Sequence, residues 1–194
     1  MASPEDYAWT QRGHAPYFCV SMLRGITADE LLDRLAAQER GGPMTLPEAV
    51  ERSFAVESSS GTALSAARTL DEGWTLWVEP NGFAAAWAGA LSAGSRLVVI
   101  EENPKGGGNF CWYEDGELKL RFEPAFACER DGSDPDSLYD EMERLGLEVV
   151  DSGDDYDIGP VHEAAYALME HLTEVRLTPE HFAGTFVTGL VKLP

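Results

Sequence analysis

The hydrophobic and polar positions of the first fifty residues alternate between strand-like and helical spacing. Residues 17–23 form a compact β-prone run, which predicts a strand. Thr27 and Glu30 follow with the spacing of a capping box, in which each side chain satisfies a free backbone amide. They predict a helix from about 28 to 38, and after a Gly-Gly-Pro break residues 47–54 predict a second short helix.

The middle of the chain has the pattern of antiparallel strands joined by tight turns. The β-prone runs 62–70 and 74–79 flank an Asp-Glu-Gly turn, and the runs 110–113 and 118–122 flank a Glu-Asp-Gly-Glu turn. Such turns between β-rich runs are typical of hairpins. The continuous aliphatic run 96–101 is typical of a central strand, so this region predicts most of one sheet.

Helical spacing marks the remaining segments. An Ala-rich run predicts a short helix at 83–91, and apolar residues every three or four positions predict helices at 134–145 and 161–172. A Thr-Pro-Glu cap at 178–180 precedes a final strand at 185–193. These elements predict an α+β fold: a single antiparallel sheet of five or six strands with helices packed mainly on one face.

Length and composition place these elements in one domain. The chain has 194 residues, of which 44% are hydrophobic, so residues 1–194 can form a single domain with a substantial core, interrupted by an acidic loop at about 148–158. Cys19, Cys111 and Cys128 are odd in number and far apart, which favours reduced thiols and an intracellular location. The first residues lack the pattern of a signal peptide, and we expect a soluble, cytoplasmic protein.

The charge is strongly unbalanced. The chain has 34 Asp and Glu against 14 Lys and Arg, a formal net charge of −20, and residues 114–157 hold 16 acids and 4 bases. A surface of this charge repels nucleic acid and anionic membranes and attracts basic proteins. We therefore expect a basic protein partner, with no direct contact to nucleic acid or membrane.

Sequence motifs do not specify a reaction. The helix that begins at His162 and Glu163 lacks the second His of a zinc peptidase, because Tyr166 stands one turn later. The acidic loops fail the EF-hand spacing, the Gly-rich stretch 106–108 has no helix after it, and the sequence has no nucleophile elbow. We expect no cofactor, metal or catalytic residue, with a weak divalent ion at the acidic loop as the alternative.

Several short runs carry a resemblance to a known family. They are an Arg-Gly pair at 24–25 after the first strand, Glu-Pro-Asn-Gly at 79–82 after a Trp-containing strand, and Glu-Asp-Gly at 114–116. Together with the order of segments, they resemble an uncharacterised family of acidic proteins from actinobacteria, chiefly Streptomyces and relatives. The resemblance implies a shared fold and source over most of the chain, and no activity.

Two classes of function follow from the residues. The first is a non-catalytic, acidic protein-interaction domain, like an immunity protein, an antitoxin or a nucleic-acid mimic, that binds a basic partner. Its candidate residues lie between the later hairpin and the last helix: Glu129, Asp131, Asp134, Asp136, Asp154, Asp155 and Asp157. The alternative is a small-ligand-binding protein or enzyme with a pocket between sheet and helices. Its candidates at strand ends are Arg24, Trp77, Glu79 and Asn81.

Overall fold

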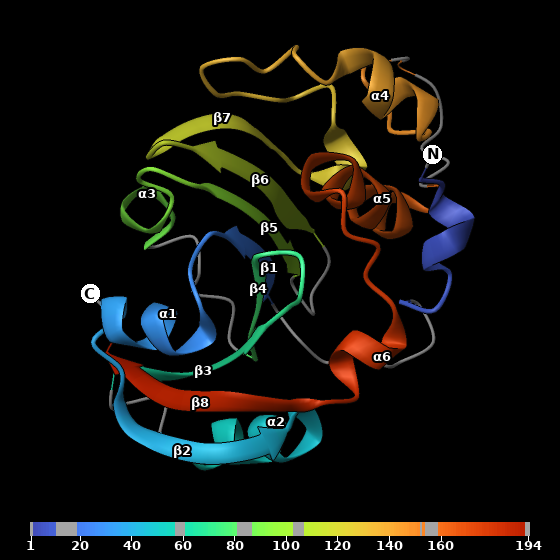
Figure 1. Ribbon diagram of the computed structural model, residues 1–194. Helices are drawn as coiled ribbons and strands as arrows, with labels where there is room; N and C mark the ends of the chain where they lie inside the picture. Colours follow the sequence, from blue (N-terminus) through green and yellow to red (C-terminus); the bar gives the residue numbers. More distant parts are fainter. Residues whose placement is uncertain are drawn as a thin grey trace.

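A single antiparallel sheet organises the protein. The computed structural model describes residues 2–10, 19–56, 61–80, 87–102, 107–151, 153 and 159–192. Within these residues eight strands run in the order β2-β8-β3-β4-β1-β5-β6-β7 (Figure 1). Their bounds are β1 Cys19–Arg24, β2 Gln38–Thr45, β3 Thr62–Thr69, β4 Trp74–Glu79, β5 Arg96–Glu102, β6 Gly108–Glu114, β7 Glu117–Phe122 and β8 Thr185–Lys192.

The predicted α+β class is confirmed, but the prediction of five or six strands is wrong, because the sheet has eight. The predicted strand runs match seven of these strands, more than the five or six expected for the sheet, and the strand without a predicted run is β2, whose start was predicted as the end of a helix. β2 is an edge strand with mostly exposed residues and two register shifts against β8, so it lacks alternating apolar positions. Pairing with β8, rather than local pattern, holds it in the sheet.

Helices cover both faces of the sheet. The α-helices are α1 Ala28–Arg34, α2 Leu46–Ala55, α3 Ala88–Leu91, α4 Tyr139–Arg144, α5 Val161–Thr173 and α6 Pro179–Phe182, and two 3-10 turns are η1 Pro4–Tyr7 and η4 Pro124–Phe126. The face with Met22 and Leu76, here the α5 face, packs against α2, α4, α5, α6 and η1. The opposite face with Leu23 and Trp77, here the α1 face, packs against α1 and α3.

The strand pattern explains this division of the core. In β4, Leu76 points to the α5 face and Trp77 to the α1 face, and both are fully buried. Because successive side chains of a strand alternate between faces, a central strand covered on both sides is apolar at nearly every position. Each such side chain contributes about 1.5–3 kcal/mol when it is fully buried.

The helix boundaries follow their caps. The predicted helix after the first strand begins at Ala28 as expected, with Thr27 Oγ1 accepting from the Glu30 amide at 3.2 Å. Glu30 pairs with Arg34 at 2.7 Å in place of the reciprocal bond of the capping box. The helix ends at Arg34 instead of at 38. The helix predicted from 134 begins later, at Tyr139, because residues 134–138 form turns.

The predicted helices at 47–54 and 161–172 correspond to α2 and α5. No helix in the described part of the chain is both long enough and apolar enough to span a bilayer.

Candidate functional site

Residues 123–151 form an acid-rich segment beyond the last strand of the sheet, here called the acidic lobe. It contains ten Asp and Glu but only two Arg. Asp131 and Arg121 exchange backbone hydrogen bonds of 2.9 and 2.8 Å, and Asp134 N donates to Lys119 O at 3.0 Å. The lobe therefore continues the sheet beyond β7 and covers its edge, which fixes the start of the lobe in place.

Some lobe carboxylates are neutralised within the protein. Asp131 lies 2.5 Å from Arg121 Nη2, and Asp136 lies 2.6 Å from Arg130 Nη2. Glu141 pairs with Arg144 at 2.6 Å, and this hydrogen bond lowers the pKa of the Glu141 carboxyl. Such pairs offset part of the local negative charge.

Five other lobe acids remain open to a partner. They are exposed and form no ion pair within the described residues: Glu129, Asp134, Asp140, Glu143 and Asp151. Glu129 and Asp134 were predicted as partner-binding residues, and the structure places them on the same lobe as Asp131 and Asp136. Asp154, Asp155 and Asp157 lie outside the described residues.

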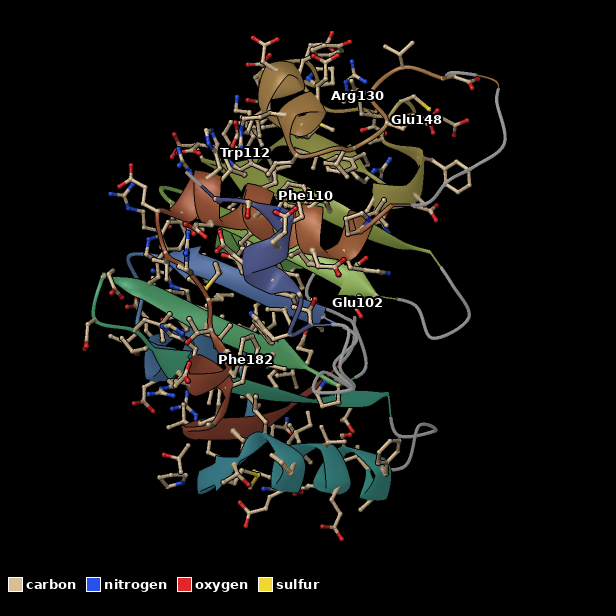
Figure 2. All side chains as sticks on the ribbon, turned by 90° about the vertical axis from the view of Figure 1, so that its right-hand side faces the viewer. Glu102, Phe110, Trp112, Arg130, Glu148 and Phe182 are labelled. Carbon is tan, nitrogen blue, oxygen red and sulfur yellow. The ribbon has the colours of Figure 1, made fainter. Side chains whose placement is uncertain are left out.

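A groove of about 440 Å³ lies between α4 and α5, here called the α4 groove. It is lined by Asp136, Ser137, Leu138, Tyr139, Asp140, Glu141, Arg144 and His171. Arg130 lies against the ring of Tyr139, with its Cζ 5.3 Å from the ring centroid. His171 Nδ1 lies 3.2 Å from Glu141 Oε1, so the groove combines three carboxylates and the Tyr139 ring with two basic side chains, Arg144 and His171. Figure 2 shows Arg130 beside α4, at the top of the view.

A second cleft of about 250 Å³ lies where the lobe leaves β7. Its lining is Asn109, Arg121, Phe122, Glu123, Phe126, Glu129 and Asp131. Both clefts combine carboxylates with an aromatic side chain. This composition suits a basic group that carries an apolar stem.

The residues predicted for a small-molecule pocket do not all come together. In the β1–β4 pairing, Cys19 faces Glu79 and Arg24 faces Trp74. Arg24 and Glu79 therefore lie at opposite ends of the strand pair, about 17 Å apart at 3.3 Å per residue. Arg24 packs on the Trp74 ring, with its Cζ 6.0 Å from the ring centroid, and forms no ion pair within the described residues. Asn81 lies outside the described residues.

Glu79 instead belongs to a line of polar residues across the α1 face, here called the polar row. The strand register places Cys19 between Glu79 and Glu101, and Glu101 beside Asn109. Ser65 Oγ donates to Glu79 Oε1 at 2.8 Å, and Asn109 Nδ2 donates to Glu101 Oε2 at 3.2 Å. Ser65, Cys19 and Glu79 are at most 1% exposed. Burial of a carboxylate is costly unless hydrogen bonds compensate for lost water, so this row is unusual for a core.

The polar row was not predicted as a unit. Sequence reasoning selected Glu79 and Trp77 because they lie at a strand end, whereas the row depends on which strands are neighbours. A signal was present, because Thr75, Trp77 and Glu79 alternate onto one face of a fully buried strand. A carboxylate on such a face indicates a polar partner on an adjacent strand.

The cysteines are free, as expected, and Cys19 and Cys111 are buried. Burial, with the nearby Glu101 carboxylate adding to it, raises the pKa of the Cys111 thiol to about 12. Cys111 is therefore a thiol rather than a thiolate at neutral pH, which makes it a poor nucleophile and metal ligand.

A second cluster of ionisable groups lies on the α5 face. His162 Nδ1 is 3.7 Å from Glu102 Oε1, and the neighbouring Glu163 is only 4% exposed. Partial burial raises the pKa of Glu102, the interaction with His162 opposes this shift, and the nearby Glu163 adds to it. Figure 2 shows Glu102 near the end of β5. Among the described residues, no three His, Cys, Asp or Glu side chains are arranged to hold a metal ion.

Comparison with known proteins gives a family without an assigned activity. A family model described as a family of unknown function (DUF6461) matches residues 1–194. The comparison with curated proteins found no match, and the comparison with solved structures found none either. The predicted membership of an uncharacterised family is confirmed, whereas the actinobacterial source stays a prediction. The chain belongs to the DUF6461 family.

Proposed function

We propose that this protein is a non-catalytic interaction domain that binds a basic partner protein through its acidic lobe. The observation that carries the proposal is the concentration of ten acids and two bases in residues 123–151, with Glu129, Asp134, Asp140 and Glu143 exposed and outside internal ion pairs. Internal pairing thus leaves a net negative surface. The groove and the cleft beside it offer places where a basic side chain can lose water.

The physical role of the lobe is attraction followed by docking. A cluster of like charges raises the rate at which an oppositely charged protein arrives, and aromatic contacts such as Tyr139 add short-range affinity. Proteins that bind nucleic acid present basic surfaces. We therefore propose, as the partner class, a nucleic-acid-cleaving toxin or a DNA-binding protein, in a cytoplasmic setting.

The test compares neutralised variants of equal net charge. The lobe variant D134N/D140N/E143Q removes three exposed carboxylates from the lobe, and the matched control E51Q/D71N/E72Q removes three exposed carboxylates elsewhere. At about 10 Å in water each charge contributes about 0.4 kcal/mol, so three contribute about eightfold in affinity at low salt.

The affinity of each variant for fluorescent nona-lysine and nona-arginine peptides is measured in 20 mM and 300 mM NaCl. The lobe variant is expected to bind both peptides several-fold more weakly than the control at low salt, with the difference reduced at high salt because salt screens the charges. Equal losses in the two variants would show that binding follows net charge alone and would overturn the proposal.

A small-ligand-binding protein or enzyme is the second candidate, and the polar row favours it. Its buried Ser65, Cys19 and Glu79 lie in line with Glu101 on the α1 face. The side-chain oxygens of such a row can accept hydrogen bonds from donor groups of a ligand bound above it. Thermal unfolding is measured with a panel of amine and polyol metabolites. A stabilising compound whose effect is lost in Glu79→Gln and kept in Glu72→Gln would support this candidate, and no shift with any compound would count against it.

A further inference from the structure

We propose that the α4 groove selects arginine over lysine on the partner protein. This inference rests on the proposed function and adds the chemical identity of the recognised side chain. The groove combines the Tyr139 ring, the Leu138 side chain and the carboxylates of Asp136 and Asp140. A guanidinium is planar, stacks on aromatic rings and binds carboxylates through a fixed fork of donors, whereas an ammonium is compact and strongly hydrated.

The lobe already holds a guanidinium in this manner. Arg130 Nε and Nη2 both donate to Asp136 Oδ1, at 2.9 and 2.6 Å, while Nη1 donates to Ala127 O at 3.2 Å and to Val149 O at 2.8 Å. Its side chain is only 12% exposed and lies against Tyr139. This internal contact shows that the ring and carboxylate are spaced for a planar cation.

Acceptor capacity remains at the solvent side of the groove. The Asp136 side chain is 73% exposed even though one of its oxygens accepts both Arg130 bonds. Asp140 is exposed, and it forms no ion pair with the described part of the protein. Tyr139 N donates to Asp136 O at 3.1 Å, so a turn leads from Asp136 into α4, and both Asp136 and Asp140 line the groove.

The other end of the groove is already occupied. Arg144 Nε and Nη2 bind the two oxygens of Glu141 at 2.8 and 2.6 Å, and His171 approaches the same carboxylate. An incoming cation at that end would meet Arg144. The recognition position is therefore the end formed by Asp136, Asp140 and Tyr139. Arg130 takes only Oδ1 of Asp136 there, so the second Asp136 oxygen and the exposed Asp140 carboxylate can accept from a basic protein segment, which charge complementarity selects as the occupant.

The experiment compares two peptides of the same charge, nona-arginine and nona-lysine, by fluorescence anisotropy at 20 mM NaCl. The intact protein is expected to bind the arginine peptide about fivefold more tightly, from a guanidinium–aromatic contact at a surface site. Tyr139→Leu and Asp140→Asn are expected to bring this ratio towards one. The matched control Asp71→Asn, in an exposed turn, is expected to leave it unchanged.

Three outcomes separate this inference from the proposed function. Both peptides could bind in a salt-dependent way while the ratio of the arginine-peptide affinity to the lysine-peptide affinity is the same in Asp140→Asn and Asp71→Asn. This result would overturn arginine selection and leave the proposed function standing. Failure of both peptides to bind at 20 mM NaCl would overturn the inference and the proposed function together. Loss of the ratio only in the groove variants, with unchanged circular dichroism, would support the inference. If Tyr139→Leu does not fold, Asp140→Asn alone still tests the inference, because Asp140 is exposed.

Discussion

At the scale of single residues, the protein concentrates its unusual chemistry in buried carboxylates. Glu79 and Glu163 are at most 4% exposed, although ionised side chains are rarely buried so fully. Glu79 accepts a hydrogen bond from Ser65, and Glu102 faces His162. The sequence could predict that Glu79 is special, because it stands on the buried face of an apolar strand. It could not predict the partners, because they come from strands that are distant along the chain.

Glu102→Gln is expected to alter the pH dependence of stability. Burial raises the pKa of Glu102 above its ordinary value of 4.5, so folding favours its protonated form. The contribution of this preference to the free energy of unfolding is complete below pH 4.5. It is lost as the pH rises through the raised pKa of Glu102, where the buried charge destabilises the fold. The neutral glutamine is therefore expected to be more stable than glutamate at pH 8 and similar at pH 4.

Urea unfolding between pH 4 and pH 8 measures this difference, with the exposed Glu72→Gln as the control. A Glu102→Gln protein that is less stable than the parent at pH 8 would contradict the account. It would mean that the pairing with His162 outweighs the cost of burial.

Ser65→Ala is expected to destabilise the fold by about 1–3 kcal/mol, the cost of leaving a buried polar group without its hydrogen bond. The change removes the hydroxyl that donates to Glu79 Oε1 at 2.8 Å in a fully buried site. Ser53→Ala is the matched control, because Ser53 Oγ is also buried but donates to the Val50 carbonyl at 2.7 Å. Equal losses of unfolding free energy in the two variants would contradict the expectation that the buried Glu79 carboxyl depends on its hydrogen bond more than a backbone carbonyl does.

At the scale of elements, local pattern predicted the strands with buried neighbours and failed at the periphery. β4 and β5 are apolar at successive positions, and α5 carries an apolar stripe, so each is visible in the sequence. β2 is polar, contains glycines and is bulged, and only its pairing with β8 makes it a strand. The register shifts also protect this edge from pairing with other chains.

Gly132→Ala is expected to release the start of the acidic lobe from β7. Gly132 has a φ of +132°, and a Cβ there would lie 2.3 Å from the backbone oxygen of Lys119. Hydrogen exchange of the Arg121 amide, which donates to Asp131 O at 2.8 Å, is expected to become faster. Gly146→Ala is the control for backbone strain alone, because its φ is +81° and its Cβ would meet nothing within 4 Å. Equal acceleration in both variants would contradict the proposed clash.

At the scale of the whole molecule, charge is distributed unevenly over the fold. The sheet order places β2 at one edge and β7, with the acidic lobe beyond it, at the other (Figure 1). Residues 29–56 at the β2 edge carry six acids and three bases, whereas the acidic lobe carries ten acids and two bases. The sequence predicted the location of this charge, because the acids are contiguous in the chain. It could not predict the α4 groove, because His171 comes from a different helix.

Under the proposed function, the acidic lobe, rather than the net charge of the whole protein, binds basic partners. Titration of the ¹⁵N-labelled protein with nona-arginine, followed by amide chemical shifts, locates the binding surface. The largest shifts are expected in residues 123–151 and around His171, and D134N/D140N/E143Q is expected to reduce them. Shifts of equal size at the acids of α1 and α2, or shifts that the lobe variant leaves unchanged, would contradict the proposed function.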